Sequence, residues 1–148
     1  MIRNDRQLRQ TCREIERLRG RLAELRRKKL GRELMALQGA SLAKMIRDLE
    51  DQTRAYREAV HGRVHRSILH RLLSPAEQNG RPRIGEAIVL LRLARGMTQE
   101  ALARKMGTRR EAVARWERDD YEGYTLETLQ KVFEALGCRF VIDVRVAG

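Results

Sequence analysis

In the first half of the chain, apolar residues recur every three or four positions, which places them on one side of an α-helix. The stripe is narrow, like the seam along which two helices pack in a coiled coil. We therefore predict two long amphipathic helices, with a break where Gly39 ends the first and Ser41 caps the second. The seam positions are Leu8, Thr11, Ile15, Leu18, Leu22 and Leu25, then Leu42, Ile46, Leu49, Thr53, Tyr56, Val60 and Val64.

Two such helices predict either an antiparallel hairpin or arms that pair with another chain. A two-helix unit buries little apolar surface of its own, so we expect it to self-associate. Residues 74–83, SPAEQNGRPR, contain both prolines of the chain and are the predicted linker, because proline disfavours helix at the residue before it. The predicted helical arm therefore covers residues 1–73.

Residues 84–137 show shorter apolar repeats that predict four or five short helices. Threonines that can cap helices precede three of these repeats, and glycines that can end helices follow two of them. The capping residues are Thr98, Thr108 and Thr125, and the terminating residues are Gly107 and Gly137.

Residues 138–146 alternate apolar and polar side chains and are rich in β-branched residues, which predicts a strand. A lone strand leaves its edges unpaired, so we expect it to pair with its twin in a dimer, or with the edge of a partner protein. The predicted fold is therefore mainly α. It has a helical hairpin or coiled-coil arm over residues 1–73, then a four- to five-helix domain over residues 84–148 with a short C-terminal β-strand.

The middle two helices of residues 84–137 have the spacing of a helix-turn-helix. Ala103 falls where the two helices cross, and a larger side chain there would push them apart. Gly107 falls in the turn, where glycine adopts a left-handed backbone at no steric cost. Val113 and Trp116, three residues apart, turn one face of the second helix into the core. The opposite face is left for a partner, as in a recognition helix that enters a major groove.

Counted from Gln99, those four residues stand at the fifth, ninth, fifteenth and eighteenth positions. With this spacing and its flanking helices, the stretch 84–137 resembles the lambda-repressor-like helix-turn-helix family, in its xenobiotic-response-element-type branch. The resemblance implies a dimeric repressor that binds double-stranded DNA at an inverted-repeat operator. It also implies a structural salt bridge between Arg92 and Glu117, which match a pair in lambdoid phage repressors.

The segments MIRNDRQ, DLEDQTRAY and DDYEGYTLETL are similar to antitoxin-type regulators of bacterial type II toxin–antitoxin pairs. This second resemblance implies that a toxin protein is a candidate partner. In this alternative, the chain is chiefly an interaction protein whose N-terminal helices neutralise the toxin, and DNA binding serves autoregulation.

The predicted DNA contacts lie on the second helix of the motif and at the start of the first. Arg110 matches a position where the family contacts a base edge, and its planar fork suits the O6 and N7 atoms of guanine. Arg109 and Arg115 could reach bases or phosphates, with a solvated basic face as the alternative. Glu111 could accept from cytosine, but we favour a capping box with Thr108. The predicted set is Thr98, Gln99, Thr108, Arg109, Arg110, Glu111, Ala114 and Arg115.

Thr98 and Gln99 begin the first helix of the motif, where exposed backbone amides suit a phosphate group. The family resemblance also implies a phosphate contact for Gln99. The loop after the second helix departs from the family, which often presents basic residues there. It contains Asp119, Asp120 and Glu122, which repel phosphate, so we expect either that the loop turns away or that the affinity for DNA is modest.

The chain has 148 residues, with 32 Lys and Arg against 20 Asp and Glu, for a net charge of +12. An excess of this size points to a polyanionic partner. Residues 1–82 hold 20 basic and 10 acidic residues, whereas residues 83–148 hold 12 and 10. The predicted DNA-reading domain is thus nearly neutral, and the arm carries the excess. A third hypothesis therefore gives the arm a non-specific contact with nucleic acid.

Several other classes of protein do not fit the sequence. No apolar run reaches the roughly 18 residues of a membrane span, and the start, MIRNDRQLRQ, lacks the apolar stretch of a secretory signal. Cys12 and Cys138 form no disulfide framework, so we expect a reducing cytoplasm. The resemblance to repressors and antitoxins implies that this is the cytoplasm of a bacterium, with the protein at the nucleoid when DNA is bound. His61 and His65 are spaced one helical turn apart, but no third ligand completes a metal site. We expect no enzyme activity, cofactor or metal.

Overall fold

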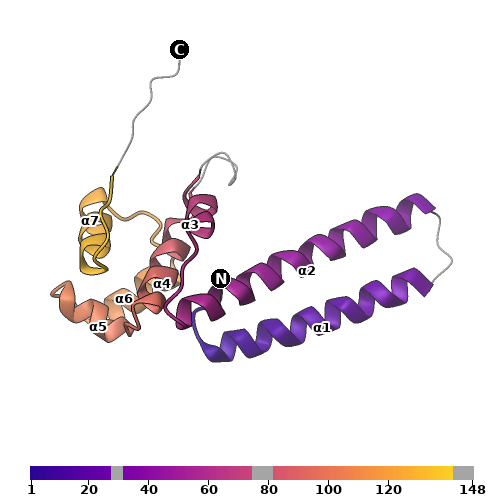
Figure 1. Ribbon diagram of the computed structural model, residues 1–148, viewed down its shortest axis with the longest axis horizontal. Helices are drawn as coiled ribbons and strands as arrows, with labels where there is room; N and C mark the ends of the chain where they lie inside the picture. Colours follow the sequence, from indigo (N-terminus) through magenta and orange to yellow (C-terminus); the bar gives the residue numbers. More distant parts are fainter. Residues whose placement is uncertain (28–31, 75–81, 142–148) are drawn as a thin grey trace, which may run out of the picture. The chain divides into compact units, whose positions relative to one another are not determined.

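The structure is a computed structural model that describes residues 1–27, 32–74 and 82–141. The chain divides into two compact units, Met1–Glu58 and Ala59–Gly148. Within the described ranges, every regular element is an α-helix (Figure 1), which confirms the mainly α prediction.

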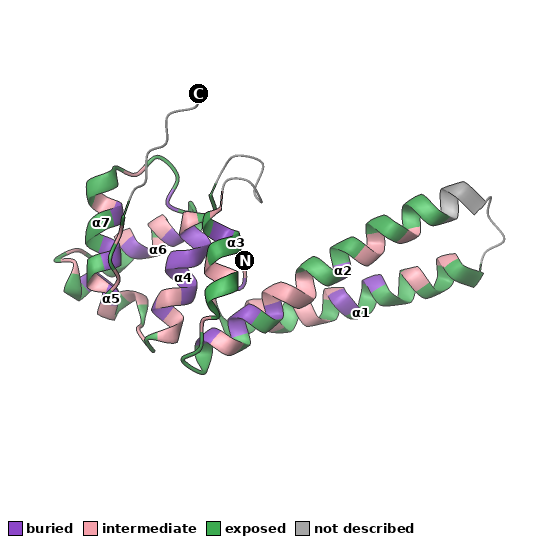
Figure 2. Cartoon of the chain, turned by 45° about the horizontal axis from the view of Figure 1, so that its top comes forward, coloured by how far each residue is buried: buried purple, intermediate pink, exposed green. Residues whose placement is uncertain are grey.

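The N-terminal unit is a pair of antiparallel helices, α1 (Asp5–Arg27) and α2 (Arg32–Val60), as the hairpin prediction requires (Figure 1). Its apolar core is small and lies on the predicted seam, with Ile15, Leu18 and Ile46 buried. Much of the remaining surface of both helices is exposed (Figure 2). Half-buried seam residues complete this core, namely Leu22, Leu42 and Leu49.

The predicted break between the two helices was wrong. Helix α2 runs without interruption through Gly39 and Ser41, and α1 ends at Arg27. A glycine inside a helix costs only about 1 kcal/mol relative to alanine, and the apolar spacing from Leu37 to Leu42 continues the helix across it. The break between the two helices therefore falls between Arg27 and Arg32, and residues 28–31 lie outside the described residues.

Helix α3 (Arg66–Leu73) lies in the C-terminal unit, whereas we expected residues up to 73 to form part of the arm. The chain leaves α2 at Val60, and His65 caps α3 through its Nδ1 atom, which accepts from the backbone amide of Ser67 at 3.3 Å. Because the helix has already ended, His61 and His65 do not share a helical face. Leu72 is buried, and α3 packs on the following helix. Residues 75–81 of the predicted linker lie outside the described residues.

Helix α4 (Ile84–Ala94) is the central element of the C-terminal unit. All six residues of its segment 85–90 are buried, which fits a sequence that is apolar on nearly every side. Helix α3 covers part of α4, and α6 contacts another part. The remaining helices of this unit are α5 (Gln99–Lys105), α6 (Arg110–Arg118) and α7 (Leu126–Ala135).

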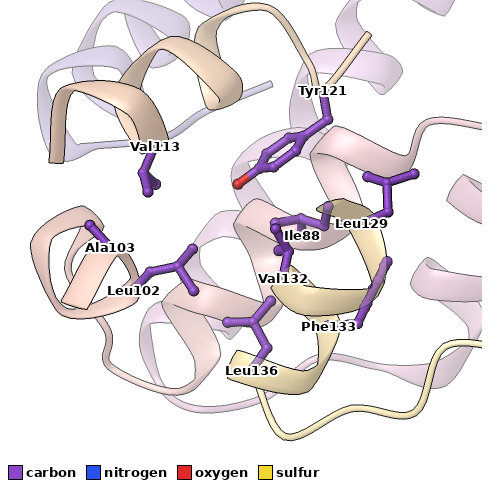
Figure 3. Close-up of a cluster of buried hydrophobic side chains, with 9 residues drawn as sticks. All are labelled: Ile88, Leu102, Ala103, Val113, Tyr121, Leu129, Val132, Phe133 and Leu136. Carbon is purple, nitrogen blue, oxygen red and sulfur yellow. The ribbon is translucent and has the colours of Figure 1, made fainter. Parts of the chain in front are cut away.

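One cluster of buried side chains joins α4, α5, α6 and α7 (Figure 3). It includes each residue that the helix-turn-helix spacing assigned to the crossing and the core, apart from Trp116, which is half-buried at its edge. The predicted core positions are therefore confirmed. The cluster consists of Ile88, Leu102, Ala103, Val113, Tyr121, Leu129, Val132, Phe133 and Leu136.

The predicted C-terminal strand is not confirmed. Residues 138–141 carry no strand, and residues 142–146 of the prediction lie outside the described residues. Phe140 instead stacks its ring on Phe133 of α7, with ring centroids 5.0 Å apart and an interplanar angle of 2°. The start of the segment thus packs against a helix of its own unit, which the alternating pattern did not predict.

Candidate nucleic-acid interface

Helices α5 and α6 cross tightly through a short turn. Ala103 is 1% exposed at the crossing, where its small side chain lets the helices approach. Gly107 has a φ of +65°, a left-handed conformation that favours glycine. The backbone amide of Thr108 donates back to the carbonyl of Ala103 at 2.9 Å, which closes the turn. The structure therefore confirms the predicted roles of Ala103 and Gly107.

Helix α6 has one face in the core and the other in solvent. Val113 and Glu117 are fully buried, while Arg110 and Arg115 are exposed and Ala114 is half-buried. Trp116 is also half-buried and packs edge-on against the ring of Tyr124, at a centroid distance of 5.6 Å. Its indole belongs to the core rather than to a surface for stacking bases, as the sequence predicted.

The predicted cap of α6 was wrong. The helix begins at Arg110, and the residue in the cap position is Arg109, whose backbone is extended and whose side chain makes no capping hydrogen bond. The turn through Gly107 uses one residue more than we expected before the helix starts. The capping box between Thr108 and Glu111 therefore does not form, and the Glu111 side chain is exposed on the same turn as Arg110.

At the start of α5, Thr98 has the predicted role of a helix cap, whereas the side chain of Gln99 is engaged within the protein. The Thr98 hydroxyl oxygen accepts from the backbone amide of Ala101 at 3.0 Å, so Thr98 caps the helix. The Gln99 side chain points toward the core, where its Nε2 donates to Glu117 Oε2 at 2.9 Å. A phosphate near this helix end would therefore meet backbone amides rather than the free amide group of Gln99.

A buried ion pair holds the two helices of the motif to α4. Arg92 donates through Nε to Glu117 Oε1 at 2.5 Å and through Nη2 to Oε2 at 3.0 Å. Its Nη1 also donates to the carbonyl of Met97 at 2.7 Å, in the segment before α5. The side chain of Arg92 is 6% exposed and that of Glu117 is 0% exposed. The salt bridge implied by the family resemblance is thus confirmed, and it ties α4, α5 and α6 into one rigid frame.

The acidic loop after α6 contains two features that sequence reasoning missed. Asp120 and Tyr121 both have positive φ angles, and Gly85 of α4 packs directly against the Asp120 backbone. The Tyr121 side chain turns inward and is 5% exposed (Figure 3). Burial, followed by the nearby Glu117 carboxylate, raises the pKa of the Tyr121 phenol. A tyrosine in a polar loop gave no sign of this role.

One acidic side chain of this loop pairs with the motif. Asp119 accepts from Nε of Arg118 at 3.2 Å, so one acidic group neutralises the last basic residue of α6. Glu122 is exposed. The prediction that this loop weakens the attraction to phosphate remains a prediction.

The described residues contain no group of three metal-ligating side chains. Cys12 and Cys138 are not joined in a disulfide. Among the helices of the described ranges, none is both long and apolar enough to cross a membrane.

Residues 88–142 match the family model described as helix-turn-helix. The match starts within α4, covers α5, α6 and α7, and spans somewhat more than a third of the chain. No curated protein and no solved structure gave a match. Taken with the crossing, the turn and the buried ion pair, the match identifies this part of the chain as a lambda-repressor-like helix-turn-helix domain, the kind of domain found in DNA-binding transcriptional regulators.

Proposed function

We propose that this protein is a dimeric, sequence-specific repressor that inserts α6 into the major groove of an inverted-repeat operator. The observation that carries the proposal is the division of α6 into a fully buried face and an exposed basic face. Val113 and Glu117 fix the rotation of the helix, and this rotation turns Arg110 and Arg115 outward. A recognition helix needs both properties, because base readout depends on a rigid presentation of a few side chains.

Arg110 is the best-placed candidate for base recognition. It is the first residue of α6, and the N-terminal residues of a recognition helix are the ones that contact base edges. Within the described residues, its guanidinium takes part in no hydrogen bond or ion pair, so its donors are available for the O6 and N7 atoms of guanine. Ala114, one turn later, leaves room for the bases beside it.

Phosphate contacts at the start of α5 would position the domain. Thr98 and the amides of the first turn lie at the positive end of the helix, which favours an anion. Glu117 holds Gln99, and both belong to the buried network that also fixes α6. A phosphate bound here would therefore be held at a fixed distance from the reading face.

The dimer follows from the operator symmetry that such domains recognise, since two copies bind half-sites one helical turn apart. Exposed apolar side chains on the C-terminal unit support self-association. Leu126, the first residue of α7, is 60% exposed, and Val141 is 73% exposed. Mass measurement of the full chain in solution tests this part, and a strictly monomeric protein on and off DNA contradicts it.

Selection of bound sequences from random DNA tests the main proposal. We expect the full chain to enrich an inverted repeat, and Arg110→Ala to weaken binding by roughly 1–3 kcal/mol and to relax one base pair per half-site. Arg104→Ala is the matched control, because this exposed arginine lies in the last turn of α5, away from the proposed contacts. If Arg110→Ala weakens binding to selected and to scrambled DNA by the same factor, Arg110 contributes only its charge and does not read a base.

A second candidate function is that of an antitoxin, whose N-terminal helices neutralise a toxin protein. The supporting observation is that the hairpin is a compact unit with its own core, separate from the DNA-reading unit. A small toxin-like reading frame beside the gene, and rescue of growth when the two are co-expressed, would support it. If no such reading frame lies beside the gene, the antitoxin function is contradicted and a plain regulator is favoured.

A further inference from the structure

Of the two helices in the hairpin, only α1 carries a net positive charge. Helix α1 contains eight arginines and four acidic residues, whereas α2 contains five basic and five acidic residues. The net charge of α1 is therefore +4 and that of α2 is zero. The DNA-reading half of the chain, by contrast, is close to neutral.

Some of the arginines in the hairpin are neutralised by neighbouring acids. Arg17 pairs with Glu14 at 2.9 Å, and Arg19 pairs with Glu50 of α2 at 2.6 Å. Arg6, Arg9 and Arg13 differ from these, because they are exposed and no ion pair or hydrogen bond involves their side chains within the described residues. Together, these three residues form the arginine stripe of α1.

The arginine stripe lies on the side of α1 that faces away from α2. Its residues are separated by three and four positions, so they share one face of the helix, and the buried Ile15 and Leu18 lie on the opposite face. At 1.5 Å of rise per residue, the stripe is about 10 Å long. Three guanidinium groups along such a line can meet successive backbone phosphates, and Arg suits phosphate because its donors are arranged in a planar fork.

The composition of α1 separates duplex DNA from other anionic partners. The helix contains no aromatic residue, so it offers no platform on which single-stranded bases could stack. Leu8, the large apolar residue between Arg6 and Arg9 in the sequence, lies on the predicted seam, so the face of the stripe lacks the large apolar side chains that anchor a helix in a lipid surface. Contact with the phosphate backbone of a duplex needs neither feature, because basic side chains neutralise phosphates without stacking on bases or entering a lipid surface.

We propose that the arginine stripe of α1 binds the phosphate backbone of double-stranded DNA without reading its sequence. The proposal rests on DNA binding by the helix-turn-helix domain, and it assigns to the N-terminal unit the electrostatic affinity that the near-neutral reading domain lacks. The exposed α6 face then supplies specificity, and α1 supplies attraction that depends on salt but not on sequence.

The test compares two triple variants of the full chain. One carries Arg6→Gln, Arg9→Gln and Arg13→Gln. The matched control, with Arg17→Gln, Arg19→Gln and Arg54→Gln, removes the same charge from arginines that already have acidic partners. Glutamine preserves helix propensity, and circular dichroism and thermal melting verify that both variants fold.

The readout is the dependence of the binding constant on salt, measured on a random-sequence duplex and on the selected operator. Each lost phosphate contact lowers the slope of log K against log salt by about 0.9, so the stripe variant should lose roughly 2 to 3 from the slope on both duplexes for each protein copy that binds. The control should change the slope by less than half as much. The sequence preference of the stripe variant should remain intact.

Three results would overturn the proposal. An unchanged slope shows that the stripe does not touch DNA, and equal changes in both triple variants show an effect of net charge alone. If the stripe substitutions instead weaken binding to vesicles of anionic lipid, or to an acidic protein, and leave DNA binding unchanged, the result assigns the stripe to that other partner. If the wild-type chain selects no sequence, the proposed repressor function fails, but the slope on random duplex still decides the role of the stripe.

Discussion

The two units of this chain place their charge and their packing differently. The N-terminal hairpin has a hydrophobic cluster in which Ile15, Leu18 and Ile46 are buried, and it exposes most of its arginines. The C-terminal unit buries a cluster from four helices around α4, and its residues 83–148, which contain the helix-turn-helix, hold 12 basic and 10 acidic residues. The part of the chain that has the geometry to read DNA, residues 83–148, therefore holds little of the net charge of +12, and residues 1–82 hold most of it. Three pairs of substitutions, each with one member in each unit, compare how strongly the stability of the two units depends on similar residues.

The largest expected difference concerns two glutamates that both pair with arginine. Glu117→Ala leaves Arg92 charged and unpaired in the interior, which should lower the free energy of unfolding of the C-terminal unit by about 3–5 kcal/mol. Glu50→Ala breaks the pair with Arg19, which is largely exposed, and should cost about 0–1 kcal/mol.

Trp116 is the only tryptophan and lies in the C-terminal unit, so its fluorescence follows the unfolding of that unit in denaturant. Circular dichroism follows both units. The double variant Arg92→Met, Glu117→Leu should recover much of the lost stability, because it removes both buried charges together. Similar small losses for Glu117→Ala and Glu50→Ala would show that the C-terminal frame does not depend on its buried pair.

Many patterns within one helix were predictable from the sequence, since they depend on near neighbours. The seam around Ile15 and Ile46 predicted two long helices, with a hairpin as one of two alternatives, and the cap at Thr98 predicted where α5 begins. The predicted cap at Thr108 is an exception, because α6 begins one residue later than expected. The helix-turn-helix core positions, such as Val113, were also correct. The spacing of the motif restricts each of these positions to a single role.

Features that depend on contacts between distant segments were not predictable. Helix α3 was assigned to the arm because nothing in its short sequence shows that Leu72 packs into the other unit. The loop that turns Tyr121 inward relies on a left-handed conformation at non-glycine residues, which is rare. Gly39 was misread because glycine can end a helix or be tolerated within one, and only the packing around it decides which.

The second pair of substitutions concerns two glycines, and here the expected effects have opposite signs. A Cβ atom on Gly85 would collide with the backbone of Asp120, so Gly85→Ala should destabilise the C-terminal unit by about 1–3 kcal/mol. Gly20 lies inside α1 with open space around it, so Gly20→Ala should stabilise the hairpin by up to about 1 kcal/mol.

Thermal melting of both glycine variants, with fluorescence for the C-terminal unit and circular dichroism for the whole chain, measures the two effects. A Gly85→Ala protein that melts like the wild type would mean that the acidic loop moves away from α4 without loss. In that case the loop is not part of the frame that holds α6.

The smallest expected difference concerns two buried tyrosines. The hydroxyl of Tyr56 donates to Asp5 at 3.0 Å, so Tyr56→Phe should destabilise the hairpin by about 1 kcal/mol. Within the described residues the hydroxyl of Tyr121 has no hydrogen-bond partner, so Tyr121→Phe should leave the stability of the C-terminal unit unchanged or slightly raised. Denaturant unfolding at neutral pH measures both.

Alkaline pH sharpens the comparison of the tyrosines. Because burial raises the pKa of Tyr121 above its ordinary value of about 10, the unfolded chain releases the phenolic proton first. The stabilisation linked to the neutral phenol is complete below that value, and it is lost as the pH rises toward the pKa of the folded protein. The wild-type C-terminal unit should therefore weaken above about pH 10, and Tyr121→Phe should weaken less. The same alkaline loss in both proteins would show that the phenol reaches solvent and that the loop around Tyr121 opens before the unit unfolds.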